Sequence, residues 1–163
     1  MEKYDELDLS ILRELREDSK QSVRVLAKLL GAHPNTVAQR IKRLEKNQVI
    51  IKYSVDVDYR KIGYDIHAVA LIKVKKGRVG EIRQLDTMIN LPEVQALYAV
   101  AGSYDVVCLI RAKTRDHLTE VLKKMQTTEI LVRSNTLLVL YTYKHPYEFN
   151  PLLLNGLSKK LTQ

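Results

Sequence analysis

The sequence predicts an α+β protein with a helical N-terminal domain and a ferredoxin-like βαββαβ sandwich in its C-terminal part. Two observations predict this fold. Apolar residues recur at helical spacing up to residue 46, and a strand–helix–strand pattern occurs twice after residue 64. We expect domains over 1–48 and 64–145, a β-strand and linker over 49–63, and a tail over 146–163. The 163 residues suffice for two small domains.

Three helices are predicted in the first domain. Asp5 is a good N-cap for a helix over about 6–17, where apolar residues return every three or four positions. Ser22 caps a second helix, and Gly31 ends it in a left-handed conformation. Pro34 stands at the favoured first position of a third helix.

The second and third helices fit a helix-turn-helix of the winged type. Ala27 provides the small residue in the second helix, Gly31 the turn and Val37 the aliphatic wedge in the third helix. Polar side chains cover the opposite side of the third helix, and outward amide and guanidinium groups can read base edges while lysines pair with phosphates. A solvated basic face on an ordinary three-helix bundle is the alternative. The candidate DNA-binding residues are Asn35, Thr36, Gln39, Arg40, Lys42, Arg43 and Lys46.

The charge of the chain agrees with a polyanion partner such as double-stranded DNA. There are 27 Lys+Arg and 19 Asp+Glu, a net charge of +8, and residues 20–46 carry seven basic residues against one acid. No apolar run is long enough to span a membrane, and there is no signal-like start. The single cysteine, Cys108, excludes an intrachain disulfide framework and suits a cytoplasmic location.

The sequence gives no indication of an enzyme, a metal site or a cofactor. The four histidines are scattered without metal-ligand spacing: His33, His67, His117 and His145. Residues 77–80 lack the ending of a phosphate-binding loop and are expected to form a turn.

Between the two domains, residues 49–58 predict a strand because their later half alternates at period two and is rich in β-branched residues. Residues 59–63 break this pattern and form the expected linker. In the second domain, LIKVK at 71–75 is echoed by LIRAK at 109–113, with an amphipathic helix after each copy, the first including Ile82, Leu85 and Ile89. Strands are expected over about 68–76, 94–100, 104–112 and 130–144.

The two copies join at a turn over residues 101–105. Gly102 permits a tight turn, while Tyr104 and Asp105 offer a hydroxyl and a carboxylate at the mouth of a strand. These groups could hold an ammonium group, or the segment could be a simple hairpin turn.

From residue 4 to residue 144 the chain resembles the Lrp/AsnC (feast/famine) family of prokaryotic transcription regulators. The resemblance rests on LDLSIL at 7–12, VAQRIKRLE at 37–45, VI at 49–50, LPEV at 91–94 and GSYD at 102–105. It implies a sequence-specific DNA-binding regulator in the nucleoid, whose linker strand pairs across a homodimer and whose dimers assemble into tetramers or octamers. It also implies an amino-acid effector held between dimers, by the turn of one subunit and the start of the last strand of a neighbouring subunit. The implied effector-binding residues are Gly102, Ser103, Tyr104, Asp105, Ser134, Asn135 and Thr136.

The alternative function is an effector-independent architectural DNA-binding protein of the same fold. The tail has leucines at helical spacing after Pro151, which predict a short helix. This helix could cover a subunit contact or pack on its own domain.

Overall fold

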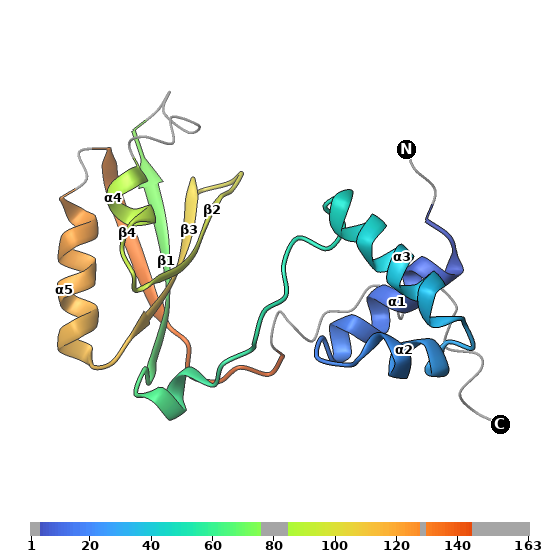
Figure 1. Ribbon diagram of the computed structural model, residues 1–163. Helices are drawn as coiled ribbons and strands as arrows, with labels where there is room; N and C mark the ends of the chain where they lie inside the picture. Colours follow the sequence, from blue (N-terminus) through green and yellow to red (C-terminus); the bar gives the residue numbers. More distant parts are fainter. Residues whose placement is uncertain (1–3, 76–84, 128–129, 145–163) are drawn as a thin grey trace. The chain divides into compact units, whose positions relative to one another are not determined.

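The computed structural model describes residues 4–75, 85–127 and 130–144 (Figure 1). The chain divides into two compact units, and the boundary between them lies between Asp56 and Val57. Each unit has its own hydrophobic core, and the two cores share no residue. No helix in the described part of the chain is both long and apolar enough to cross a membrane.

Residues 4–56 of the N-terminal unit form the three predicted helices: α1 (Glu6–Glu17), α2 (Val23–Leu29) and α3 (Pro34–Lys46). Side chains outside each helix cap its N-terminus. The Asp5 carboxylate accepts from the Asp8 N–H at 3.0 Å, the Ser22 hydroxyl from the Val25 N–H at 3.3 Å, and the His33 Nδ1 from the Asn35 N–H at 3.3 Å. The core of this unit consists of Ile11, Leu26, Ala27, Val37 and Leu44.

The prediction of a strand over residues 49–58 is wrong for the single chain, which has no strand there. Residues 51–58 have no regular secondary structure, although the alternation of side chains that predicted a strand is present. A strand needs a neighbour for its hydrogen bonds, and within the described residues the four strands pair only with one another. The apolar side chains of the segment are therefore exposed, Ile51 at 86% and Val55 at 70%.

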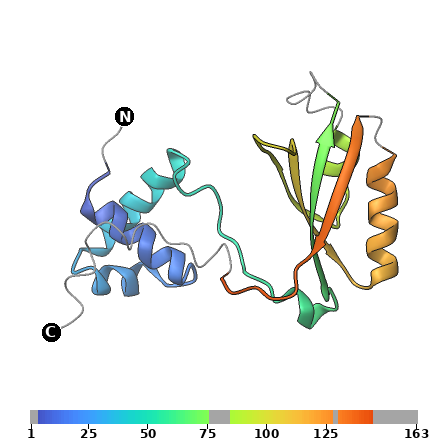
Figure 2. The same cartoon turned by 180° about the vertical axis from the view of Figure 1, so that it is seen from behind.

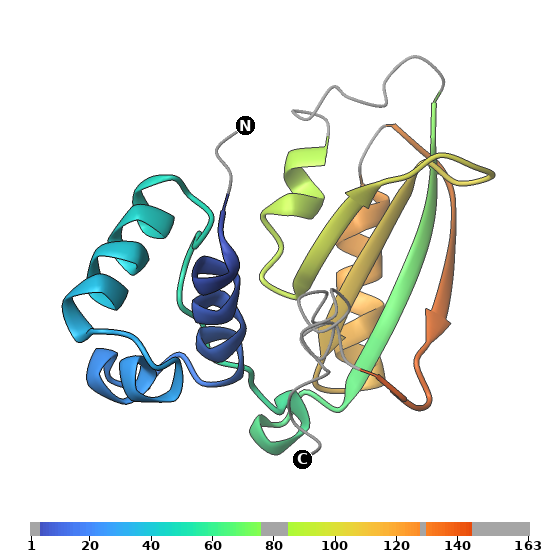
Figure 3. The ribbon, with the colours of Figure 1, turned by 90° about the vertical axis from the view of Figure 1, so that its right-hand side faces the viewer.

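The C-terminal unit is the predicted ferredoxin-like sandwich. A short 3-10 turn, η1 (Tyr59–Ile62), leads into β1 (Ile66–Val74), which is followed by α4 (Asp86–Ile89), β2 (Val94–Ala99), β3 (Val106–Ala112), α5 (Arg115–Gln126) and β4 (Leu131–Leu138). The sheet is antiparallel throughout with the order β2-β3-β1-β4 (Figure 2). Both helices lie on one side of the sheet (Figure 3).

The last strand of this unit is shorter than predicted. The last strand ends at Leu138 rather than near residue 144, because its neighbour β1 begins at Ile66 and the final backbone hydrogen bond joins the Val139 N–H to the His67 carbonyl. The helix of the first copy is described only over α4, since Ile82 lies outside the described residues. The turn expected at 77–80 and the tail at 146–163 also lie outside them.

Alternation along the two central strands builds the core of the sandwich. On β1 every second side chain from Ala68 to Val74 is buried, and β3 buries every second side chain from Val106 to Ala112. These residues form one cluster with Val121 of α5. The other side of the sheet carries the intervening side chains of both strands.

Candidate DNA-reading helix and effector turn

Helix α3 has a buried side and a polar side. Val37 and Leu44 pack into the core of the N-terminal unit and are fully buried. Five of the seven predicted DNA-binding residues are exposed on the helix: Asn35, Thr36, Gln39, Lys42 and Lys46. This face carries amide, hydroxyl and ammonium groups, which can hydrogen-bond base edges and pair with phosphates.

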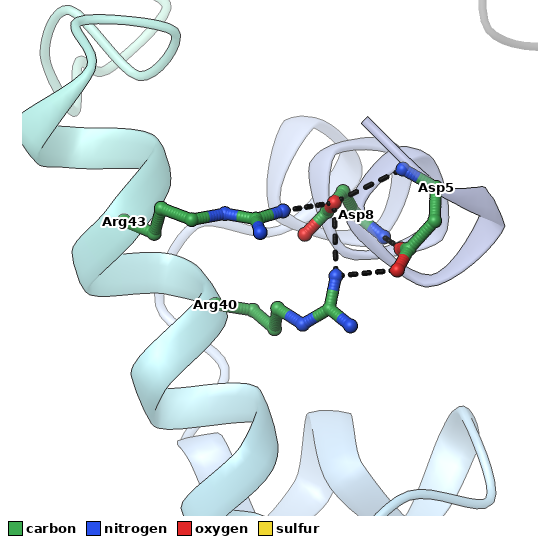
Figure 4. A network of polar contacts seen from close by, with 4 residues as sticks. All are labelled: Asp5, Asp8, Arg40 and Arg43. Carbon is green, nitrogen blue, oxygen red and sulfur yellow. Dashed lines mark hydrogen bonds and ion pairs between the residues drawn. The ribbon is translucent and has the colours of Figure 1, made fainter. Parts of the chain in front are cut away.

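The other two predicted DNA-binding residues, Arg40 and Arg43, are only partly exposed and point toward α1 (Figure 4). The Arg40 Nη1 donates to the Asp5 Oδ2 at 2.5 Å and to the Asp8 Oδ2 at 3.0 Å. The Arg43 Nη2 donates to the same oxygen of Asp8. The Arg43 guanidinium also lies 5.9 Å from the centre of the Tyr4 ring.

Burial explains why these ion pairs hold. Asp8 is fully buried, the only such charged or polar residue within the described ranges, so its carboxylate needs donors in place of water. The hydrogen bonds from Arg40 to Asp5 and Asp8 raise the pKa of Arg40. The pKa of Asp5 is lowered, most by the hydrogen bond from the Asp8 backbone N–H and next by the hydrogen bond from Arg40. All these effects favour the charged forms of the network.

The helical periodicity of residues 34–46, taken alone, predicts that Arg43 faces outward. One signal in the sequence could have indicated otherwise. Asp5, the predicted N-cap, and Asp8 are three residues apart at the start of the first helix, and Arg40 and Arg43 are three apart on one side of the third, so the two pairs have complementary charge.

The second predicted site, the turn before β3, is tied to the end of β1. Gly102 has a positive φ of 145°, a backbone conformation that glycine adopts much more readily than other residues, and Ser103 beside it is exposed. The Asp105 carboxylate accepts from the Lys73 Nζ at 2.9 Å and from the Val74 N–H at 2.9 Å. The Lys73 ammonium and this N–H lower the pKa of Asp105. Both carboxylate oxygens therefore already have partners within the chain.

The turn also meets the beginning of β4 within the same chain. The Arg133 guanidinium lies 5.3 Å from the centre of the Tyr104 ring. Ser134, Asn135 and Thr136 follow on β4, opposite Ile72, Leu71 and Ala70 of β1. Alternation directs Asn135 to the open face of the sheet, and Ser134 and Thr136 to the side of the helices.

His117 and Cys108 of the sandwich are held by contacts within their own unit. The His117 Nε2 lies 3.0 Å from a carboxylate oxygen of Glu93, and its Nδ1 accepts from the Lys113 N–H at 3.2 Å. Cys108 is buried in β3, which raises the pKa of its thiol to about 12. In the ranges that the structure describes, no three side chains of His, Cys, Asp or Glu are placed to hold a metal ion.

Comparison with known proteins agrees with this geometry. Residues 5–45 match the AsnC-type helix-turn-helix domain, and residues 67–149 match the Lrp/AsnC ligand binding domain. The HTH-type transcriptional regulator FL11 of Pyrococcus furiosus is 33% identical over 88% of this chain and 94% of its own.

Two solved structures share the fold. The structure of E. coli AsnC matches with a TM-score of 0.81 at 27% identity, over 88% of this chain and 97% of its own. A feast or famine regulatory protein from M. tuberculosis, complexed with L-methionine, matches with a TM-score of 0.79 at 25% identity, over 87% of this chain and 95% of its own. The chain belongs to the Lrp/AsnC family of transcriptional regulators, which are DNA-binding regulators and not enzymes.

Proposed function

We propose that this regulator binds specific DNA sequences through the exposed face of α3. The observation that carries the proposal is the separation of two sides on this helix. Val37 and Leu44 anchor it in the core, while Asn35, Gln39 and Lys42 face solvent. In a helix-turn-helix the second of the two helices enters the major groove, where such side chains meet base edges and phosphates.

The test is a salt series of DNA binding with matched lysine variants. A duplex selected from a random pool by repeated binding is compared with a scrambled duplex. Lys42→Gln should reduce the slope of log affinity against log salt by about 0.9 for each phosphate that the lysine neutralises in the wild-type complex. Lys123→Gln, an exposed lysine on α5, is the control and should leave the slope unchanged. Equal slopes for wild type and Lys42→Gln would contradict this use of α3.

We further propose that a small effector such as an amino acid binds between dimers, at the turn over 102–105 of one subunit and at residues 134–136 of β4 of a neighbouring subunit. The ligand-binding family of the C-terminal unit and the methionine complex of the M. tuberculosis relative support this. Thermal unfolding in the presence of each of the twenty amino acids tests it, since a ligand at about a hundred times its Kd adds about 2.7 kcal/mol to stability. Asp105→Ala should abolish the response, because it releases the turn from Lys73 and Val74. A response that survives in this variant would exclude this role of Asp105.

We also propose a homodimer that assembles into tetramers or octamers. The exposed apolar side chains of Ile51, Val55 and Val57 favour it, because a second chain could pair with this segment. On the open face of the sheet, Tyr98 and Leu137 are half exposed and could be covered in the same way. Light scattering over a range of protein concentrations measures the mass of the assembly. A monomer mass at every concentration would refute the proposal.

The second candidate function is an effector-independent architectural DNA-binding protein in the prokaryotic cytoplasm. The paired carboxylate of Asp105 favours it, because an ammonium ligand would have to displace Lys73. Affinity for the selected and the scrambled duplex at one salt concentration separates the candidates. A ratio near one, with no amino-acid response, would support the architectural function.

A further inference from the structure

We infer that Asp8 is a positioning residue for DNA recognition: it holds Arg40 and Arg43 against α1, fixes the rotation of α3, and keeps both guanidiniums away from DNA. The inference rests on the proposed use of α3 as the reading helix. It differs from the sequence-based expectation, in which both arginines belong to the DNA-contacting set.

The hydrogen bonds converge on a single oxygen. The Asp8 Oδ2 accepts from the Asp5 N–H at 3.1 Å, from the Arg40 Nη1 at 3.0 Å and from the Arg43 Nη2 (Figure 4). The Asp8 side chain has no solvent exposure, so turning either arginine toward DNA would remove a cation from a buried anion. The Nε of Arg43 is also buried, so the inner edge of this guanidinium does not face solvent.

Two anchors on one side of a helix oppose its rotation. Arg40 and Arg43 are one turn apart on α3, and both reach the N-terminal turn of α1. Gln39 and Lys42 each precede an anchored arginine by one residue, which places them about 100° around the helix axis from it. When the arginines are held, the direction of Gln39 and Lys42 is therefore set as well.

The same ion pairs decide which charges are available for phosphates. Of the four basic residues of α3, Arg40 and Arg43 have carboxylate partners on α1. Lys42 and Lys46 are exposed, and they are the cations of α3 that are free to approach the DNA backbone. Fewer side chains of α3 therefore contribute to the salt dependence of DNA binding than the sequence implies.

The experiment compares Lys42→Gln, Arg43→Gln and Asp8→Asn in the full-length protein, on the selected and scrambled duplexes, over a salt series. We expect Lys42→Gln to reduce the salt slope by about 0.9 per phosphate, and Arg43→Gln to keep the wild-type slope while its preference for the selected duplex falls. Asp8→Asn should bind scrambled DNA more tightly than wild type and with a steeper slope, because it releases the Arg43 guanidinium, while Arg40 keeps its ion pair with Asp5. A merely structural role of Asp8 would not steepen the slope.

A second variant protects the test against simple unfolding. Arg43→Gln leaves the Asp8 charge with fewer partners, whereas Asp8→Asn/Arg43→Gln removes both charges together and should recover the cooperative urea transition and the wild-type slope. A slope that falls in Arg43→Gln as much as in Lys42→Gln would overturn the inference, because Arg43 would then meet a phosphate. If wild type does not prefer the selected duplex, the proposed sequence-specific function fails. The salt slopes of Lys42→Gln and Arg43→Gln then still show whether Arg43 contacts a phosphate.

Discussion

Leu44→Ala should destabilise the DNA-reading unit by about 2–5 kcal/mol. Leu44 of α3 is fully buried in the cluster that contains Ile11, Leu26 and Val37. Burial of a leucine side chain is worth about 1.5–3 kcal/mol, and the cavity left by the smaller alanine adds to this loss. Below about 70–80 residues a single core supplies only about 3–5 kcal/mol, so the substitution removes much of the stability of this small unit.

The assay is hydrogen exchange of the full-length chain, read separately on peptides from α3 and from β3. Protection in α3 should fall by a factor of roughly 30 to 4,000, because each 1.4 kcal/mol is tenfold, while protection in β3 stays at the wild-type level. The matched control is Leu29→Ala on α2, a leucine that is 62% exposed and should change stability by no more than about 0.5 kcal/mol. A loss below about 1 kcal/mol for Leu44→Ala, or equal losses for both variants, would refute the assignment of Leu44 to a closed core.

Three further predictions concern titratable groups. Hydrogen bonds lower the pKa of Asp5, Glu93 and Asp105 below their ordinary values of 3.8 to 4.5. As the pH is lowered through this range, the unfolded chain takes up protons before the folded chain does, so the free energy of unfolding decreases. A urea midpoint that is constant from pH 5 to pH 2.5 would contradict this. Burial raises the pKa of the Cys108 thiol to about 12, so iodoacetamide at pH 8 should alkylate it only after unfolding. Rapid labelling of the folded protein would contradict this, because the thiol would then be accessible. Tyr53 is half exposed, but partial burial and the hydrogen bond from its hydroxyl to the Glu45 carboxylate at 2.8 Å raise its pKa to about 12. The ultraviolet titration of Tyr53→Phe should therefore lose one phenol near pH 12, and a loss near pH 10 would show that this hydrogen bond does not hold in solution.

The secondary structure of the folded units was predictable because it depends on neighbours along the chain. Asp5, Ser22 and Pro34 mark the starts of the three helices, and the structure confirms each start. The similarity of 71–75 to 109–113, each followed by an amphipathic helix, predicted the two central strands and the ferredoxin-like order of the sheet. These signals act over a few residues, where capping and side-chain period decide the conformation.

The segment over residues 51–58 shows the limit of such signals. Its alternation is typical of a strand, but a strand forms only when another backbone lies beside it. A sequence pattern states which side chains could share a face, and it does not supply the partner. The described part of this chain offers that segment none, so Ile51 and Val55 remain exposed.

Patterns along the chain were sufficient to predict the two units, the amphipathic α3 and the residue types available at each site. The packing of the elements against one another determines which of those residues are free to bind. Arg43 meets Asp8 across 35 positions of sequence, and Lys73 meets Asp105 across 32. A charged side chain that loses water must find an opposite charge, and the partner it finds depends on how the elements pack, which no local pattern encodes.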